Sequence, residues 1–299
     1  ASLFGGVCNN SGAALVRRGP AYTELALYAR VNDDGQLELV NHLGVNLGET
    51  PEEILSKLET KNYQIGDIIN NSGCCASDHR YGHDVKQVDE NTPARFNADP
   101  SRLYEASGSA GKVCVFAVRL DTFEKIPSQV FYVGTNSHDD LTEIRRFLLK
   151  DLPRLPIAGE YIHRVAYDIG AEYGKDTFMF IEKLGTAKVP AAFAMKDKVD
   201  AYLEKFGMKG LSDKVLQLIT KFLPNHLPKR MNAFRDLYEH HLIIRVENQD
   251  VEQVESFLKR YFQDKSSGDF FHCSEEEGRK AFLHRFAVAG AAIRYRDTH

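Results

Sequence analysis

The sequence predicts an α+β protein, because strand-like and helix-like segments follow one another without an internal repeat. Three observations indicate this class. Residues 23–31 and 36–41 are β-rich and flank a polar turn at 32–35, as in a hairpin. Residues 113–120 are nearly all apolar, which predicts a strand buried on both faces. Capped helical patterns begin near Thr50 and near Ser274.

The first helix is predicted from its N-terminal signals. Thr50 is a good N-cap, Pro51 suits the first helical position, and Glu53 stands where a capping box needs a carboxylate. Apolar residues at 54, 55 and 58 then follow helical spacing. Residues 59–99 become polar and irregular, which predicts a long surface excursion.

In the second half of the chain, strand and helix patterns alternate more regularly. Residues 130–135 predict a strand, and Ser137 predicts the cap of a following helix. We expect a helix over 159–174, a strand over 175–183, and short helices over 183–235, where glycine and proline recur. A strand at 242–247, a helix at 251–265 and a strand at 269–273 complete the pattern, and Ser274 to Glu277 form a capping box for the last helix.

Composition is that of a folded globular protein. Hydrophobic residues make up 43% and charged residues 27% of the 299 residues, enough for two domains with separate cores. No apolar run approaches the roughly 20 residues that a membrane-spanning helix needs. The five cysteines have no metal-ligand spacing and indicate reduced thiols, so no metal site is expected.

The net charge of −4 hides a strong asymmetry. Residues 183–235 contain eleven basic and four acidic residues, a charge of +7, whereas the rest of the chain carries −11. Such a field attracts a polyanion. Large apolar residues among the lysines favour a membrane surface, and no nucleic-acid-binding signature is present, so we expect no nucleic acid partner. Ordinary amphipathic helices with a solvated basic face are the other interpretation of the same pattern.

The start of the chain concentrates glycine and small polar residues between Ser2 and Ala14. Glycine lets a ligand approach the backbone closely, and asparagine and serine can bind a pyrophosphate or a flat heterocycle. A tight turn between buried strands would use the same residues. The residues alone leave both interpretations open.

These motifs and several others together resemble one family. The chain is similar to the quinone-dependent, FAD-containing D-lactate dehydrogenases of bacterial membranes over essentially its whole length. The strings that carry the resemblance are Gly5–Gly12, Arg17–Glu24, Ala94–Pro100, Ser107–Lys112, Tyr238–His241 and Lys280–Ala287. Chains of that family extend further at both ends, so the expectation is an interior fragment.

The resemblance implies a domain organisation. Residues 1–121 would be the second part of an FAD-binding domain of the vanillyl-alcohol-oxidase type. Residues 122–299 would be a cap domain, an antiparallel sheet with helices, which carries a basic helical membrane-binding insertion over about 183–235. The absence of a Gly-x-Gly-x-x-Gly motif between a strand and a helix agrees with a flavin domain that is not a Rossmann fold.

The resemblance also implies cofactor-binding positions. Ser2 and Gly12 in the first glycine-rich motif and Val115 on the strand after the second would contact FAD, and Gly6 lies in the same loop. Val115 would contribute mainly backbone groups, since its side chain is apolar.

The function that the resemblance implies is respiratory. D-lactate would be oxidised to pyruvate by hydride transfer to FAD, and the electrons would pass to membrane quinone. The protein would be peripheral on the cytoplasmic side of the cell inner membrane, held by anionic phospholipids. The alternatives are an FAD-dependent dehydrogenase of another D-2-hydroxy acid and a lipid-binding fragment without catalytic activity.

A small 2-hydroxy acid needs a cation for its carboxylate and a base for its hydroxyl proton. The candidates are the pairs His163-Arg164 and His284-Arg285, and Arg294, although each could equally be a satisfied structural residue. His240 and His241 precede an apolar strand and are interpreted as structural. The sequence identifies no catalytic base, and it contains neither a zinc-protease helix motif nor a serine-hydrolase elbow.

Overall fold

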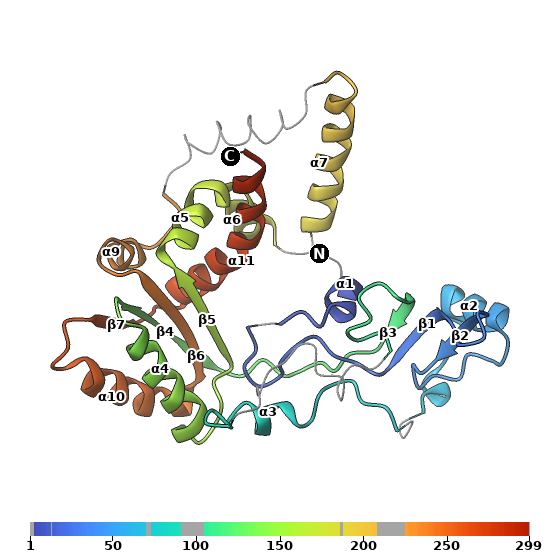
Figure 1. Ribbon diagram of the computed structural model, residues 1–299, viewed down its shortest axis with the longest axis horizontal. Coiled ribbons are helices and arrows are strands. Elements are labelled where there is room, and N and C mark those ends of the chain that lie inside the picture. The colour runs from blue at the N-terminus through green and yellow to red at the C-terminus, as the bar shows by residue number, and fades with distance from the viewer. Residues whose placement is uncertain are drawn as a thin grey trace. The chain divides into compact units, whose positions relative to one another are not determined.

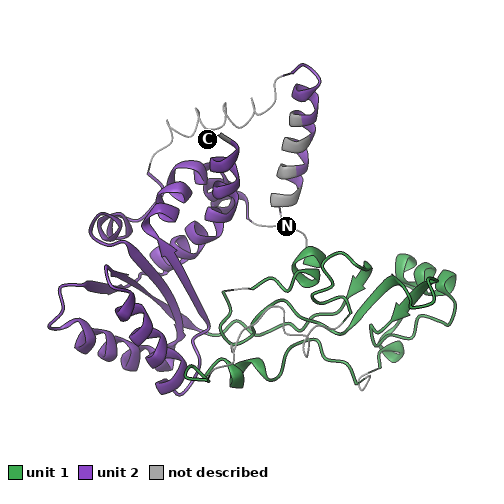
Figure 2. Cartoon of the chain, in the orientation of Figure 1, with its two compact units in different colours: residues 1–126 green, residues 127–299 purple. Residues whose placement is uncertain are grey.

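The computed structural model describes residues 3–12, 14–69, 73–90, 105–185, 188–207 and 225–298. The chain forms two compact units, residues 1–126 and 127–299, which are described separately (Figure 2). Both are α+β with antiparallel sheets. The sequence placed the boundary between domains at residue 121, and the structure divides the chain after Ile126.

Unit 1 is built on a three-stranded antiparallel sheet in the order β2-β1-β3 (Figure 1). β1 (Ala26–Val31) and β2 (Leu37–Asn41) form the predicted hairpin. The Asn32 side chain closes its turn by accepting hydrogen bonds from the backbone N–H groups of Asp34 and Gln36. β3 (Cys114–Val118) pairs with the other side of β1 and is therefore an edge strand of this sheet.

The helices of unit 1 are short: α1 (Leu3–Cys8), α2 (Pro51–Thr60), η1 (Ile65–Asp67) and α3 (Tyr81–Asp84). The predicted N-cap of α2 is confirmed, since the Thr50 hydroxyl accepts from the Glu53 N–H at 3.3 Å. The Glu53 carboxylate bonds the N–H of Glu49 and not that of Thr50, which displaces the expected capping box by one residue.

Two small clusters form the core of unit 1, one around Tyr28 and one around Leu27, neighbours on β1 that point to opposite faces. Val115 packs against the Tyr28 cluster. Cys114 and Phe116 are exposed, so the prediction that β3 is buried on both faces is wrong. An apolar run shows that a strand is suited to burial, but the elements packed on it decide which faces are covered.

Unit 2 contains a four-stranded antiparallel sheet in the order β5-β6-β4-β7 (Figure 1). The strands are β4 (Ser128–Thr135), β5 (Ala158–His163), β6 (His240–Glu247) and β7 (Gly268–His272). β4 and β6 are central and almost wholly buried. β5 and β7 are the edges, and β5 pairs with β6 from Ala158 opposite Arg245 to His163 opposite His240.

Helices cover both faces of this sheet. α4 (His138–Arg146), the π-helical turn η3 (Phe147–Asp151) and α10 (Val251–Phe262), which follows η5 (Asn248–Asp250), pack on one face. α5 (Arg164–Tyr173), α6 (Lys175–Leu184), α9 (Lys229–Leu237) and α11 (Glu275–Thr298) pack on the other. α7 (Val189–Glu204) follows α6 in the chain.

Several predictions for unit 2 are confirmed and two are wrong. Ser274 and Glu277 form the expected reciprocal capping box at the start of α11. Residues 159–163, expected to be helical, belong to strand β5, and residues 175–183, expected to be a strand, form α6. Ser137 precedes α4 as predicted, but its side chain makes no capping hydrogen bond.

A buried carboxylate links the end of β4 to the loop before β7. Asp140 accepts hydrogen bonds from Thr135, Ser267, Tyr261 and Lys265, at 2.5–3.2 Å. Burial raises the pKa of Asp140, but these four donors favour the charged form more strongly, so the pKa lies below its ordinary value.

Three histidines are buried among the helices on the α11 side of the sheet: His226, His241 and His284, which we call the buried histidine set. Burial lowers the pKa of His226 and His241 to about 4 and that of His284 to about 3, so all three are neutral. The His226 ring packs on Phe178 of α6 with centroids 4.4 Å apart. His226 therefore brings the chain back to α6.

Candidate functional site

The two glycine-rich motifs of unit 1 lie side by side. The N–H of Gly108 donates to the carbonyl of Val7 at 3.1 Å, and the N–H of Ala110 donates to that of Cys8 at 2.8 Å. The turn at 107–111 is therefore tied to the C-terminal end of α1. Segments about a hundred residues apart in sequence form one backbone surface, a proximity that sequence spacing could not reveal.

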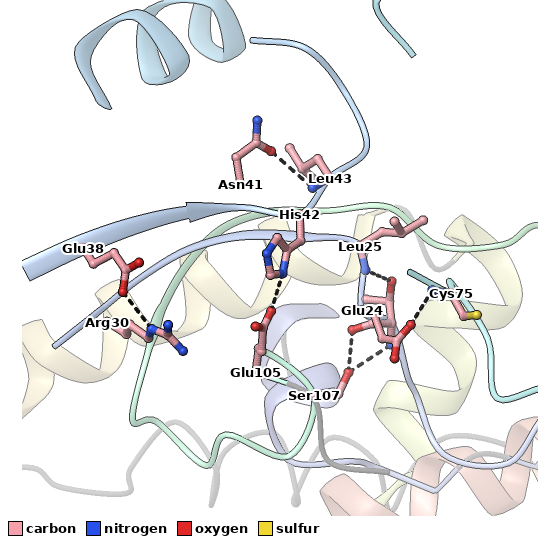
Figure 3. A network of polar contacts seen from close by, with 11 residues as sticks. Glu24, Leu25, Arg30, Glu38, Asn41, His42, Leu43, Cys75, Glu105 and Ser107 are labelled. Carbon is pink, nitrogen blue, oxygen red and sulfur yellow. Dashed lines mark hydrogen bonds and ion pairs between the residues drawn. The ribbon is translucent and has the colours of Figure 1, made fainter. Parts of the chain in front are cut away.

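Ser107 fixes this turn to the start of β1 (Figure 3). Its hydroxyl accepts from the Thr23 N–H at 2.9 Å and donates to the Thr23 carbonyl at 2.8 Å. Beside it, Glu105 contacts the His42 ring at 2.7 Å, which links the same turn to the end of β2. The second motif is thus held rigidly against the sheet that carries Val115.

Open space lies beside the glycines of this surface. A Cβ atom built on Gly6, Gly12 or Gly111 would meet no atom of the described residues within 4 Å. Gly111 also has a positive φ of 87°, which side chains rarely adopt. A ligand could therefore approach the backbone here, as the binding of a dinucleotide requires. The arrangement fits FAD as far as the described residues extend, and Ser2 lies outside them.

Val115 lies on β3, directly after this turn, opposite Tyr28 of β1. Its side chain is part of the Tyr28 cluster. Because β3 is an edge strand among the described residues, backbone groups along its outer edge remain available to a ligand. The backbone contact of Val115 with the cofactor stays a prediction.

The predicted substrate residues of unit 2 do not converge. His284 is fully buried in the helical core, which rules it out as a direct contact for a substrate from solvent. Arg285 pairs with Glu160 at 3.0 Å, and Arg294 pairs with Asp176 at 2.8 Å. These arginines hold α11 to β5 and to α6.

His163 and His240 instead belong to a group of rings on the α4 side of the sheet, at the edge strand β5. We call His138, Tyr161, His163 and His240 the histidine cluster. The His240 ring centroid lies 4.3 Å from that of His138, 5.4 Å from His163 and 5.9 Å from Tyr161. The Tyr161 hydroxyl and His240 Nδ1 are 2.8 Å apart.

Sequence reasoning missed this cluster because its members come from the start of α4 and from two strands that pair non-locally. The register of His163 opposite His240 was the missing signal. His241, the neighbour of His240, points to the other face and is buried, as its structural interpretation predicted. Within the described ranges, no group of three or more His, Cys, Asp or Glu residues could hold a metal ion.

The described part of the basic segment carries an exposed apolar stripe on α7. Met195, Val199 and Tyr202 are exposed at helical spacing, and Phe206 follows with its ring 5.2 Å from that of Tyr202. Lys198 and Lys205 are exposed beside them. We call these four apolar residues the α7 stripe. Apolar side chains flanked by lysines suit a helix that lies in a membrane interface.

Not all the basic residues of 183–235 belong to such a surface. Arg230 pairs with Glu277 of α11 and stacks over Phe271, and Arg235 pairs with Asp168 of α5 at 2.6 Å. These two arginines hold α9 against unit 2. The described helices include none that is long and apolar enough to cross a bilayer.

Comparison with known proteins shows which family the chain belongs to. Residues 130–299, more than half of the chain, match the family described as D-lactate dehydrogenase, membrane binding. Over its whole length the chain is 55% identical to quinone-dependent D-lactate dehydrogenases of Escherichia coli and of Haemophilus influenzae, and 43% identical to that of Corynebacterium glutamicum over 99% of its length. It spans about half the length of these curated relatives, 52–53%. The chain therefore belongs to the D-lactate dehydrogenase membrane-binding family.

Proposed function

We propose that this chain is part of a respiratory flavoprotein that oxidises D-lactate to pyruvate, with FAD as the hydride acceptor, and passes the electrons to membrane quinone. The observation that carries the proposal is the 55% identity over the whole chain to two quinone-dependent D-lactate dehydrogenases. Identity of this extent covers both units, so it supports a shared activity and not only a shared membrane-binding module.

Unit 1 would hold the cofactor, in a domain of the vanillyl-alcohol-oxidase type. Its contribution would be the backbone surface formed by the loop with Gly6 and Gly12, the turn at 107–111 and the edge of β3 at Val115. Three features support this placement: the hydrogen bonds that join the two motifs, the open space beside their glycines, and the fixed position of Ser107. FAD, when bound, supplies the acceptor for the hydride from C2 of D-lactate.

Unit 2 would hold the protein on the membrane. The α7 stripe would enter the interface of the cytoplasmic side of the inner membrane, with Lys198 and Lys205 facing anionic phospholipid headgroups. Each basic residue near such a surface contributes about 1 kcal/mol. The match of residues 130–299 to a membrane-binding family supports this role.

An absorbance experiment tests the catalytic part of the proposal. FAD is added to the chain, unbound cofactor is removed, and D-lactate is then added without oxygen. A retained flavin band that bleaches with D-lactate but not with L-lactate supports a D-lactate dehydrogenase. Faster bleaching by a longer D-2-hydroxy acid would favour the related dehydrogenase of another substrate.

The same preparation tests the non-catalytic alternative. A chain that remains colourless after addition of FAD, yet sediments with anionic vesicles, would be a lipid-binding fragment. That result would contradict the catalytic proposal for this chain while leaving its membrane role intact.

A further inference from the structure

Exposed apolar residues lie next to members of the histidine cluster in the chain, and we call Val165 and Leu237 its rim. Tyr161 is 43% exposed on the outer strand β5, Val165 at the start of α5 is 59% exposed, and Leu237 at the end of α9 is 63% exposed. Val165 is joined to His163 by a hydrogen bond, and Leu237 lies three residues before His240. Both rim residues are held near the cluster through their backbones, Val165 by His163 and Leu237 by the Asn136 side chain, which bonds its carbonyl at 3.1 Å, and within the cluster His240 is itself buried.

A hydrogen bond fixes the tautomer of the His163 ring, and a second one involves Nδ1 of His240. His163 Nδ1 accepts from the Val165 N–H at 3.2 Å, so the neutral ring carries its hydrogen on Nε2. His240 Nδ1 lies 2.8 Å from the Tyr161 hydroxyl, and when this hydroxyl donates to Nδ1 the neutral His240 ring carries its hydrogen on Nε2 as well. Neither Nε2 atom has a hydrogen-bond partner among the described residues. With Tyr161 as the donor to His240, the cluster offers two N–H donors.

The charges around the histidine cluster favour a neutral ligand over an anionic one. Burial and the neighbouring rings of His138 and His163 lower the pKa of His240, which keeps that ring neutral. The adjacent guanidinium of Arg164 is paired with Glu239 at 3.1 Å. A carboxylate would find no uncompensated cation here, whereas a neutral flat ring with carbonyl acceptors would find donors, ring faces and an apolar rim.

The chain also connects this place to the membrane-binding segment. α9 is the last helix of the basic segment, and its C-terminal residue, Leu237, belongs to the rim. A helix of its length spans about 13 Å, so the rim lies within a short distance of Lys229 in the chain path. A membrane surface that contacts the exposed Lys229 would therefore bring a lipid-soluble ligand close to this edge of unit 2.

We propose that the histidine cluster and its rim, Val165 and Leu237, bind the headgroup of the quinone. The carbonyl oxygens would accept hydrogen bonds from Nε2 of His163 and of His240, with the ring packed against the cluster. This inference rests on the proposed function for the need of a quinone, but the site itself is argued from the donors, the rim and the compensated charge.

Binding of duroquinone to the full chain tests the site directly. Its fully substituted ring does not add to thiols, which matters because Cys114 is exposed. The titration is followed by NMR of histidine rings in chain labelled with ¹³C-histidine. We expect the signals of His138, His163 and His240 to shift together, while those of the buried histidine set stay in place.

Three variants make the test specific. His163→Asn keeps a good N-cap for α5 but removes the Nε2 donor, and should raise the duroquinone Kd about fivefold, as expected for one hydrogen bond. Leu237→Glu should raise it at least as much. Ile293→Glu, an equally drastic change at an exposed position of α11, should leave it within about twofold.

The proposed site would be wrong if Leu237→Glu and Ile293→Glu changed the duroquinone Kd equally, or if only the NMR signals of other histidines shifted. The titration needs neither flavin nor lactate, so it is independent of the proposed oxidation. Duroquinone bound at the cluster in a chain that does not oxidise D-lactate would contradict the proposed function alone. Flavin bleaching by D-lactate without duroquinone binding would contradict this site alone.

Discussion

Replacing Phe206 with Ser tests whether the α7 stripe inserts into lipid. Phe206 is 62% exposed, and a phenylalanine side chain buries about 200 Å² when fully enclosed, so about 120 Å² remains to be buried. At about 25 cal/mol per Å², full burial would contribute about 3 kcal/mol and half burial about 1.5 kcal/mol. The variant should therefore bind vesicles roughly ten- to a hundredfold more weakly.

Sedimentation with vesicles of phosphatidylglycerol and phosphatidylcholine measures this difference. Serine leaves the charge unchanged, so the dependence of binding on salt should be that of the unmodified chain. Phe286→Ser is the matched control, because Phe286 is the same residue type with nearly the same exposure, 60%, on α11. Unchanged binding by Phe206→Ser, or an equal loss with Phe286→Ser, would refute insertion of the stripe.

The remaining predictions concern charge, cofactor, acid and the core. Reversing Lys198 and Lys205 to Glu should weaken vesicle binding at low salt and flatten its salt dependence; an unchanged salt dependence would count against an electrostatic contribution. Gly12→Val should lower the flavin-to-protein absorbance ratio without changing the melting temperature of unit 2, because its Cβ meets open space in the protein; full flavin occupancy would make the loop purely structural. Acid should destabilise unit 2, because the buried histidine set has folded-state pKa values of about 3–4, below the unfolded value near 6.5. The unfolded chain therefore binds more protons than the folded chain as the pH falls from about 7.5 to about 5.5. Over that range each histidine should lower the free energy of unfolding by about 1.4 kcal/mol. Urea titrations at the two pH values check this, and His284→Leu should remove about a third of the difference. Asp140→Ala should lower the free energy of unfolding by about 3 kcal/mol, since it leaves four donors without their acceptor; a loss below about 1 kcal/mol in urea would show that water replaces the carboxylate.

Elements defined by local signals could be predicted from the sequence. The β1–β2 hairpin, the Thr50 cap of α2 and the capping box of α11 depend on residues within a few positions of one another. α6 was mistaken for a strand because its middle is a continuous apolar run. Only its packing in the core of unit 2, where Phe178 and Ile181 are buried, shows that helical spacing governs these residues.

In the candidate sites, too, contacts that depend on tertiary folding could not be predicted from the sequence. Gly6 and Gly12 could be singled out from composition and resemblance, yet their contact with the turn at 107–111 depends on tertiary folding. His163 was a candidate on chemical grounds, but its neighbours in the cluster come from pairing of β5 with β6. A single sequence carries no register, and register decides which side chains share a face.

The contact of His226 with Phe178 leaves the segment between them free to vary in length. Because His226 returns the chain to α6, the intervening residues close a loop whose entropic cost rises only logarithmically with length, about 0.6 kcal/mol for each doubling. Insertions, deletions or wholesale exchange of that loop should leave the underlying sheet untouched. Evolution could thus change that segment while the core of unit 2 stays the same.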